Sequence, residues 1–462
     1  MMKNIIGLLF LLMLSGIAEA QIMNYPDPNS ANISGGYGLT WIDGKPFNAF
    51  RFRPEIAFSK IGIGLDLNLE FDAEGKLNKE NFNEFSDYLS IIRYVRYGSK
   101  TEPFYARLGA LDYATLGHGS IMYMYNNSPS FDVRKVGLEL DLDMGKAGFE
   151  TVYGNFGEAG VIGIRGFVRP LQFTELSEIP VISNLEVGAT FAEDFNKYSG
   201  VTSASLDSVT KEVKINYDYG RMQIMGFDLG LPISFGTYFK ITPYFDFTKI
   251  LNFGQGTSIG LMFNMNGLGV VDAQAKFERR LNGDRYLPSY FNSLYEIERF
   301  RLNSNTSGLP KNSLIRGNLG KAAVLDAIGA VGNGYYGELL LRFLNSFDVI
   351  GSYQRLDENP ESGILHLVTD ISPREGSYVA RAGYDKINIK NEKDLFTLDD
   401  RSYLFAEVGY KPLPFMLVSL VYNWTFSPLR DKDENVIDFE PQKKIETRIS
   451  FVYPLNFGGS QQ

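Results

Sequence analysis

The chain has 462 residues, a formal net charge of -9, two histidines and no cysteine. The absence of cysteine excludes disulfides, thiolate metal sites and cysteine nucleophiles. Two histidines leave almost no room for a histidine-based triad or a multi-histidine metal site, and the lack of a basic excess argues against nucleic-acid binding.

The first twenty residues have the pattern of a secretory signal peptide. Lys3 precedes an apolar run over residues 5–14, and Ala18-Glu19-Ala20 is a small-x-small cleavage site. We therefore expect cleavage after Ala20 and export of residues 21–462 as one domain. The longest later uncharged stretch, residues 250–271, is interrupted by glycines and asparagines and does not predict a transmembrane helix.

The mature chain is dominated by apolar residues that alternate with polar ones. In residues 61–72 every odd position is apolar and every even position is glycine, polar or acidic. This period of two predicts strands with one face in oil and one in water. Twenty segments fit the pattern: 33–42, 47–58, 61–72, 89–97, 103–112, 133–143, 148–155, 161–169, 184–194, 221–231, 238–248, 255–264, 269–280, 333–343, 347–356, 363–370, 376–388, 402–412, 414–424 and 443–457.

The connections between these segments separate by length. With a periplasmic mature N-terminus, the long connections fall on the outside and the short ones on the inside, apart from residues 43–46 and 170–183. Alternating strands with this asymmetry and no transmembrane helix predict an all-β fold, a transmembrane antiparallel up-and-down β-barrel of about 18–20 strands. A soluble sandwich has no reason to sort its connections in this way.

The mature chain resembles bacterial outer-membrane β-barrel proteins of the porin-like class, in texture most like the large barrels of Bacteroidota and Chlorobi-type bacteria. The resemblance is carried by the signal peptide, the alternating strands and the terminal strand at residues 443–457, with aromatics at Phe451, Tyr453 and Phe457. It implies location in the outer membrane, contact with its lipid, and recognition of the last strand by the barrel insertion machinery. In that class the chain usually ends at the aromatic residue, whereas here residues 458–462 follow Phe457.

The phase of the alternation predicts a charged inner face. Because a closed barrel of this size is wide enough for water, we expect these side chains to line a hydrated pore, although ion pairs that only brace the wall are an alternative. The predicted lumen-facing residues are Arg51, Arg53, Glu55, Asp66, Glu70, Arg107, Glu139, Asp141, Arg165, Arg169, Lys276, Glu278, Arg280, Glu338, Arg342, Arg381, Glu407, Glu446 and Arg448.

One connection, residues 281–332, is too long to be a turn. Apolar residues at helical spacing within 288–302 and 310–328 predict two short helices, so the loop is either a plug inside the barrel or a cap outside it. His118, between Gly117 and Gly119, is predicted as a turn histidine in an outer loop.

No arrangement of residues predicts a catalytic site, a metal site or a cofactor. The most plausible role from the sequence is passive passage of small hydrophilic solutes, with residues 281–332 as the restricting element. A carrier of hydrophobic molecules and a barrel-anchored protein that binds other macromolecules through loops 195–220 and 281–332 are the alternatives, and a hydrolase is disfavoured by the scarcity of histidine.

Overall fold

A computed structural model gives the fold of the chain. It describes residues 30–456 except 43–44, 73, 78–87, 89–90, 101, 129–134, 158, 207–211, 237, 266–269, 301–319, 328–331, 345, 358–361, 372–375, 392, 398–401, 414 and 431–435. The predicted signal peptide at residues 1–20 and Phe457 lie outside the described residues.

The described chain is almost entirely antiparallel strand. In order, the elements are β1 (Ser30–Ile42), β2 (Lys45–Phe58), β3 (Ile61–Leu65), β4 (Leu67–Phe71), β5 (Ile92–Tyr97), β6 (Phe104–Gly109), β7 (Gly137–Asp143), β8 (Ala147–Tyr153), β9 (Val161–Val168), η2 (Pro170–Phe173), η3 (Glu175–Glu178), η4 (Ile182–Asn184), β10 (Glu186–Asp194), β11 (Val201–Leu206), β12 (Val213–Asp218), β13 (Met222–Gly230), β14 (Ile233–Phe235), β15 (Phe239–Ile250), β16 (Gln255–Met265), β17 (Val271–Asn282), α3 (Tyr295–Glu298), α4 (Lys321–Ala327), β18 (Gly334–Phe343), β19 (Phe347–Leu356), β20 (Gly363–Ile371), β21 (Tyr378–Ile389), β22 (Ser402–Leu413), β23 (Met416–Arg430) and β24 (Val436–Asn456).

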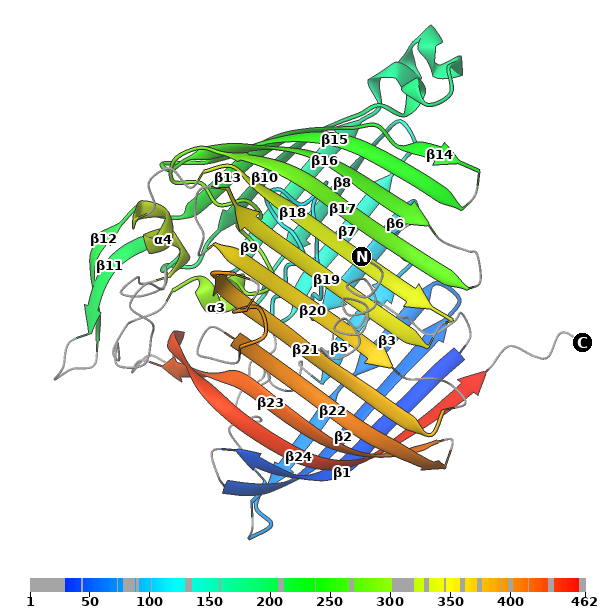
Figure 1. Cartoon of the computed structure of the whole chain (residues 1–462), viewed down its shortest axis with the longest axis vertical. Coiled ribbons are helices and arrows are strands. Elements are labelled where there is room, and N and C mark those ends of the chain that lie inside the picture. Colours follow the sequence, from blue (N-terminus) through cyan, green and yellow to red (C-terminus); the bar gives the residue numbers. More distant parts are fainter. Residues whose placement is uncertain are drawn as a thin grey trace, which may run out of the picture.

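The sheet closes on itself as a barrel (Figure 1). β1 pairs with β2 on one side and with β24 on the other, from Ser30 opposite Asn456 to Ile42 opposite Lys444. Among the described residues 22 strand segments join this sheet, but β3 and β4 both pair with β2, and β13 and β14 both pair with β15, so each couple is one interrupted strand and twenty strands remain. Closure leaves no free edge in the barrel wall.

The structure therefore confirms the predicted fold class, and each of the twenty predicted segments overlaps one barrel strand. The predicted outer loop at residues 43–46 becomes a tight connection because β1 and β2 extend to Ile42 and Lys45. The predicted inner connection at residues 170–183 is built from three short 3-10 helices. Within the predicted loop 195–220, β11 and β12 form a separate hairpin.

The two faces of the wall differ as the alternation predicts. On β3, Ile61 and Ile63 are exposed, whereas Asp66 and Glu70, of the opposite phase, are buried. The same rule gives the outer surface a belt of exposed apolar side chains, which includes Val95, Leu108, Ile164, Phe191, Met225, Phe227, Ile259, Leu261, Phe277, Leu339, Val408, Leu420, Ile449 and Phe451. No helix in the described part of the chain is long and apolar enough to cross a bilayer.

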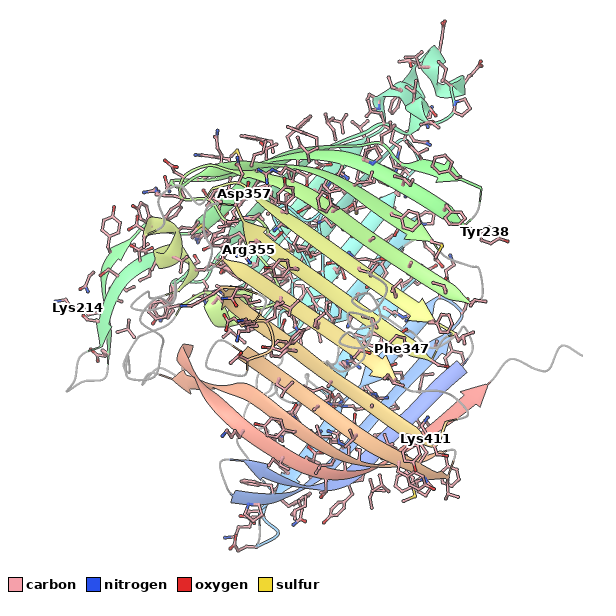
Figure 2. The ribbon with its side chains drawn as sticks, viewed as in Figure 1. Lys214, Tyr238, Phe347, Arg355, Asp357 and Lys411 are labelled. Carbon is pink, nitrogen blue, oxygen red and sulfur yellow. The ribbon has the colours of Figure 1, made fainter. Side chains whose placement is uncertain are left out.

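The two ends of the barrel are unequal. The hairpin β11–β12 and the helices α3 and α4 gather at the left end in Figure 1, while β14 and its turn lie at the right end. Figure 2 shows Lys214 at the far left on the hairpin, with Tyr238, Phe347 and Lys411 at the opposite end. This is the segregation of long and short connections expected from the sequence.

Candidate functional site

Two loops fold into the barrel and join each other there. One follows β6, at residues 110–128, and the other follows β17, at residues 283–300. Met122 and Phe291 form a parallel bridge between them. The amide of Phe291 donates to the carbonyl of Ile121 at 3.0 Å, and the amide of Tyr123 donates to the carbonyl of Phe291 at 3.0 Å. We call these two segments the inserted loops.

A hydrophobic core holds the inserted loops together and against the wall. Its residues come from both loops and from the inner faces of β8, β9, β10, β13 and β15, and most are completely buried. They are Leu111, Ala114, Leu116, Ile121, Met122, Tyr125, Val152, Val161, Ala192, Met222, Ile224, Ile250, Phe253, Tyr286, Tyr290, Phe291 and Tyr295, with Ala322 and Leu325 from α4. A packed core inside the wall means that this part of the lumen is filled.

Glycines in the wall make room for the inserted loops. A Cβ atom on Gly163 would lie 2.5 Å from Leu116, one on Gly226 would lie 2.9 Å from Ile121, and one on Gly256 would lie 2.1 Å from Tyr286. Carbon atoms in van der Waals contact sit at about 3.5–4.0 Å, so a larger residue at these positions would require the facing side chains of the loops to move. The wall is therefore shaped to receive the loops.

The first inserted loop is also fixed to the wall by polar contacts around His118. Its Nδ1 lies 2.7 Å from Asp246 Oδ1, and Ser120 donates to the other oxygen of Asp246. The imidazole stacks on Tyr244 with ring centroids 4.3 Å apart, and Lys276 donates to the His118 carbonyl at 2.6 Å. The loop thus spans from β15 to β17.

These contacts correct the prediction for His118. A turn is present, because Gly117 and Gly119 have positive φ angles of 55° and 93°. However, the histidine is buried against the inner wall and is not part of an external loop. The apolar residues Leu116, Ile121 and Met122 need a dry surface, and the inner face of β9 and β13 supplies it.

The second inserted loop is tied to the first by a buried ionic network at Glu296 on α3. Its carboxylate accepts from Tyr125 at 2.6 Å and pairs with Lys135 at 2.5 Å and Arg299 at 2.7 Å. Burial favours the neutral acid, but the charges of Arg299 and Lys135 outweigh burial and lower the pKa of Glu296 to about 2. Arg299 also pairs with Asp194 at the end of β10, at 2.5 Å.

The predicted residues on β6–β9 and β17, with Glu338 on β18, are all paired; Arg107, Glu139, Arg165, Lys276, Glu278 and Arg280 are buried, and Asp141, Arg169 and Glu338 are half-buried. Arg165 contacts Glu150, Glu186 and Asp228 at 2.6–2.9 Å, and its side chain is only 2% exposed. The other ion pairs here are Arg107–Asp112, Glu139–Lys100, Asp141–Lys100, Arg169–Asp143, Lys276–Glu278 and Arg280–Glu278, and Glu338 accepts from Tyr123 and Tyr336. These residues brace the wall and hold the loops.

The remaining predicted residues lie on the arc from β18 through β24 to β5, where several basic side chains are partly exposed and the acidic Asp66, Glu70, Glu407 and Glu446 are buried. Arg53 is 25% exposed and Arg381 is 31% exposed, although both lie on the face opposite to the apolar belt. The ion pairs of this arc are Arg51–Glu446, Arg448–Glu446, Arg53–Asp66, Glu55–Arg93, Glu70–Lys444, Arg342–Asp348, Arg381–Asp370 and Arg381–Glu407. Arg53 and Arg381 therefore keep part of their surface open to solvent.

Several residues of the site were not identified from the sequence. Asp228 and Asp246 lie on strands whose inner faces also carry apolar residues such as Met222 and Ile224, because those faces pack against the inserted loops. The inward-facing positions of such a strand are therefore not all hydrophilic, and the alternation does not show which face is the inner one. The glycines opposite the loops, Gly163 and Gly226, are the sequence signal that an inward insertion leaves.

Comparison with known proteins adds a distant likeness in shape. No family model and no curated protein matches the chain. Among solved structures, it is similar to OccK11 (OpdR) of Pseudomonas aeruginosa, with 11% identity, 92% of this chain and 95% of that chain covered, and a TM-score of 0.31. It is also similar to a triple mutant of the Rhodopseudomonas blastica porin, with 9% identity, 92% and 99% coverage, and a TM-score of 0.27. These scores are too low to support an inference about function, so the barrel assignment rests on the strand pairing described above.

Proposed function

We propose that this protein is a channel of the bacterial outer membrane that lets small hydrophilic solutes pass passively. The observation that carries the proposal is the contrast between the two sides of the lumen. The inserted loops fill the side formed by β6–β17 with a buried apolar core, while on the arc from β18 to β5 Arg53, Arg342 and Arg381 are ion-paired and 20–31% exposed, with no inserted loop packed on them among the described residues. A solute moving along that arc keeps contact with water and charge.

The restriction in this proposal is built by both inserted loops and not by residues 281–332 alone. Residues 283–300 pack on residues 110–127, which are themselves fixed to the wall through His118 and Ser120. The predicted helix at 310–328 is represented by α4, and residues 301–319 lie outside the described residues. The export signal and the insertion signal at residues 443–457 remain part of the proposal.

One observation favours a second candidate function, transport of partly apolar molecules. On the inner face of β19, β20, β22 and β23, Ile350, Val368, Phe405 and Val421 form a small apolar cluster between the charged rows. A carrier of hydrophobic molecules would use such a surface, whereas a channel for hydrophilic solutes has no need of it.

Reconstitution separates the two candidates. Single-channel recording in planar bilayers should show stepwise, ohmic current, and proteoliposomes should swell in isotonic sugar or amino-acid solutions. A correctly folded barrel that gives neither current nor swelling would refute the channel. If such a barrel instead carried a hydrophobic dye across the vesicle membrane, the carrier hypothesis would replace the channel hypothesis.

A further inference from the structure

The connection between β9 and β10 exposes an unusual amount of apolar surface for a segment outside the barrel wall. Four of its large apolar side chains, at positions 173, 176, 179 and 182, are 41–63% exposed. They are Phe173, Leu176, Ile179 and Ile182, and they repeat every third residue. The segment consists of the three short helices η2, η3 and η4, with extended backbone at Thr174 and Ile179 between them, so these side chains form a row by their spacing and exposure and not by one continuous helix face. We call residues 170–185 the rim segment.

The rim segment is ordered by its own hydrogen bonds. The amides of Thr174, Ile179 and Leu185 each donate to the carbonyl three residues earlier, at 3.0–3.2 Å. Gln172 Nε2 donates to the Ser183 carbonyl at 3.1 Å, which ties the two ends of the segment together. The exposed apolar row thus lies on a backbone that is ordered by hydrogen bonds, and its exposure does not come from an unstructured loop.

Neighbouring turns continue the apolar surface on both sides. Lys146, from the β7–β8 turn, lies 5.2 Å from the ring of Phe173, and Met144 of the same turn is exposed. On the other side, Phe235 of β14 and Tyr238 are exposed at the same end of the barrel (Figure 2). The rim segment therefore continues the margin of the apolar belt.

The direction of the rim segment selects its partner. Figure 1 shows it at the top right, beyond the outline of the strands and sideways from the wall, at the end where the short connections lie. A structure that extends sideways at the margin of the belt meets the surface of the bilayer, whereas one that extends along the barrel axis would meet the periplasm. In the membrane location proposed above, on which this inference rests, lipid covers the adjoining belt.

The charged residues of the segment indicate that its other side faces water. Residues 170–185 contain two acidic residues, Glu175 and Glu178, and no basic residue. Peripheral helices that bind anionic lipids carry lysine and arginine on the polar face, which this segment lacks. Its attachment would depend on apolar burial, with both carboxylates turned to solvent.

We propose that the rim segment lies in the interface of the periplasmic leaflet, with Phe173, Leu176, Ile179 and Ile182 among the lipid acyl chains. The segment would act as a lateral membrane anchor beside the β9–β10 hairpin. It fixes the depth of that hairpin in the bilayer, independently of whether the barrel conducts solutes.

Site-directed spin labelling tests this placement, and the absence of native cysteine makes single labels possible. The variants are L176C and I182C in the apolar row, with S177C and E178C as matched controls from the same turns. Each labelled protein is folded into phosphatidylcholine vesicles, its barrel is checked by heat-modifiability on gels, and its collision rates with oxygen and with a water-soluble nickel chelate are measured.

The labels at positions 176 and 182 should collide several-fold more with oxygen than with nickel, and the labels at 177 and 178 should show the reverse. Nickel access at all four positions would place the segment in water and overturn the proposal. Protection of 176 and 182 from both reagents would overturn it as well, because it would indicate contact with protein.

Discussion

The junction between the inserted loops gives the sharpest test of the constriction, through Phe291→Ala. The Phe291 ring is completely buried and contacts the rings of Tyr290 and Tyr295, with centroids 5.4 and 4.7 Å away. Truncation of a buried phenylalanine to alanine costs about 3–5 kcal/mol. The backbone bridge to Met122 is unchanged by the substitution, so the cost falls on packing.

If the whole of that free energy is lost from loop docking, the equilibrium between docked and undocked loops shifts by a factor on the order of 10²–10⁴. The barrel strands keep their own pairing, so the protein should still fold. We expect single-channel current in planar bilayers to show frequent excursions to a higher level as the constriction opens. The matched control is Phe277→Ala, because Phe277 lies on the outer belt of β17 and is 56% exposed.

The control should conduct like the unmodified protein. A folded Phe291→Ala barrel with the same current level and the same noise as the unmodified protein would show that the inserted loops do not restrict the channel. Heat-modifiability on gels distinguishes that outcome from a failure to assemble.

Three further predictions follow from the wall and the network. Gly226→Val should increase current noise, because its Cβ would lie 2.9 Å from Ile121, whereas Gly166→Val, where nothing lies within 4 Å, should not. Leu339→Arg should impair assembly by about 2–4 kcal/mol because this exposed side chain faces lipid, while Ser352→Arg, on the inner face opposite Glu338, should assemble; equal behaviour on gels would contradict the assigned faces. The pKa of Glu296 is lowered from 4.5 to about 2, so its ion pairs contribute fully above pH 4.5 and are lost as the pH falls toward 2. Current noise should therefore rise only in that pH interval, and Glu296→Gln should abolish this dependence on pH. A rise in noise that begins near neutral pH would contradict the role assigned to Glu296.

The strands were predictable because their signal is local. The alternation over residues 61–72 depends only on neighbouring positions, and the lipid belt demands an apolar residue at every second position. For the same reason the inward phase of Arg51, Arg53 and Glu446 could be read directly. The ion pair between Arg51 and Glu446 joins residues far apart in the chain, but the two lie on strands that closure brings together across β1.

The inserted loops were only partly predictable because their contacts are long-range. Loop 281–332 was recognised by its length, and the structure places residues 283–300 of it inside. The loop at 113–132, which contains His118, was expected outside the barrel. Nothing near His118 in the sequence shows that it contacts Asp246, which lies on a strand 128 residues away. Its apolar residues Ile121 and Met122 and the glycines of β9 and β13 are a joint signal that neither segment carries alone.

The pairing of β1 with β24 has a consequence for biosynthesis. The thirteen residue pairs of this junction connect Ser30–Ile42 with Lys444–Asn456, so the ring cannot close until nearly the whole chain has been made. Contacts between such distant parts of a chain form late and slowly. A chain cut short before β24 would leave the donors and acceptors of β1 and β23 unpaired on two open edges, which favours aggregation. The closed wall therefore cannot exist before the last strand is present, and every shorter product of the chain keeps two open edges.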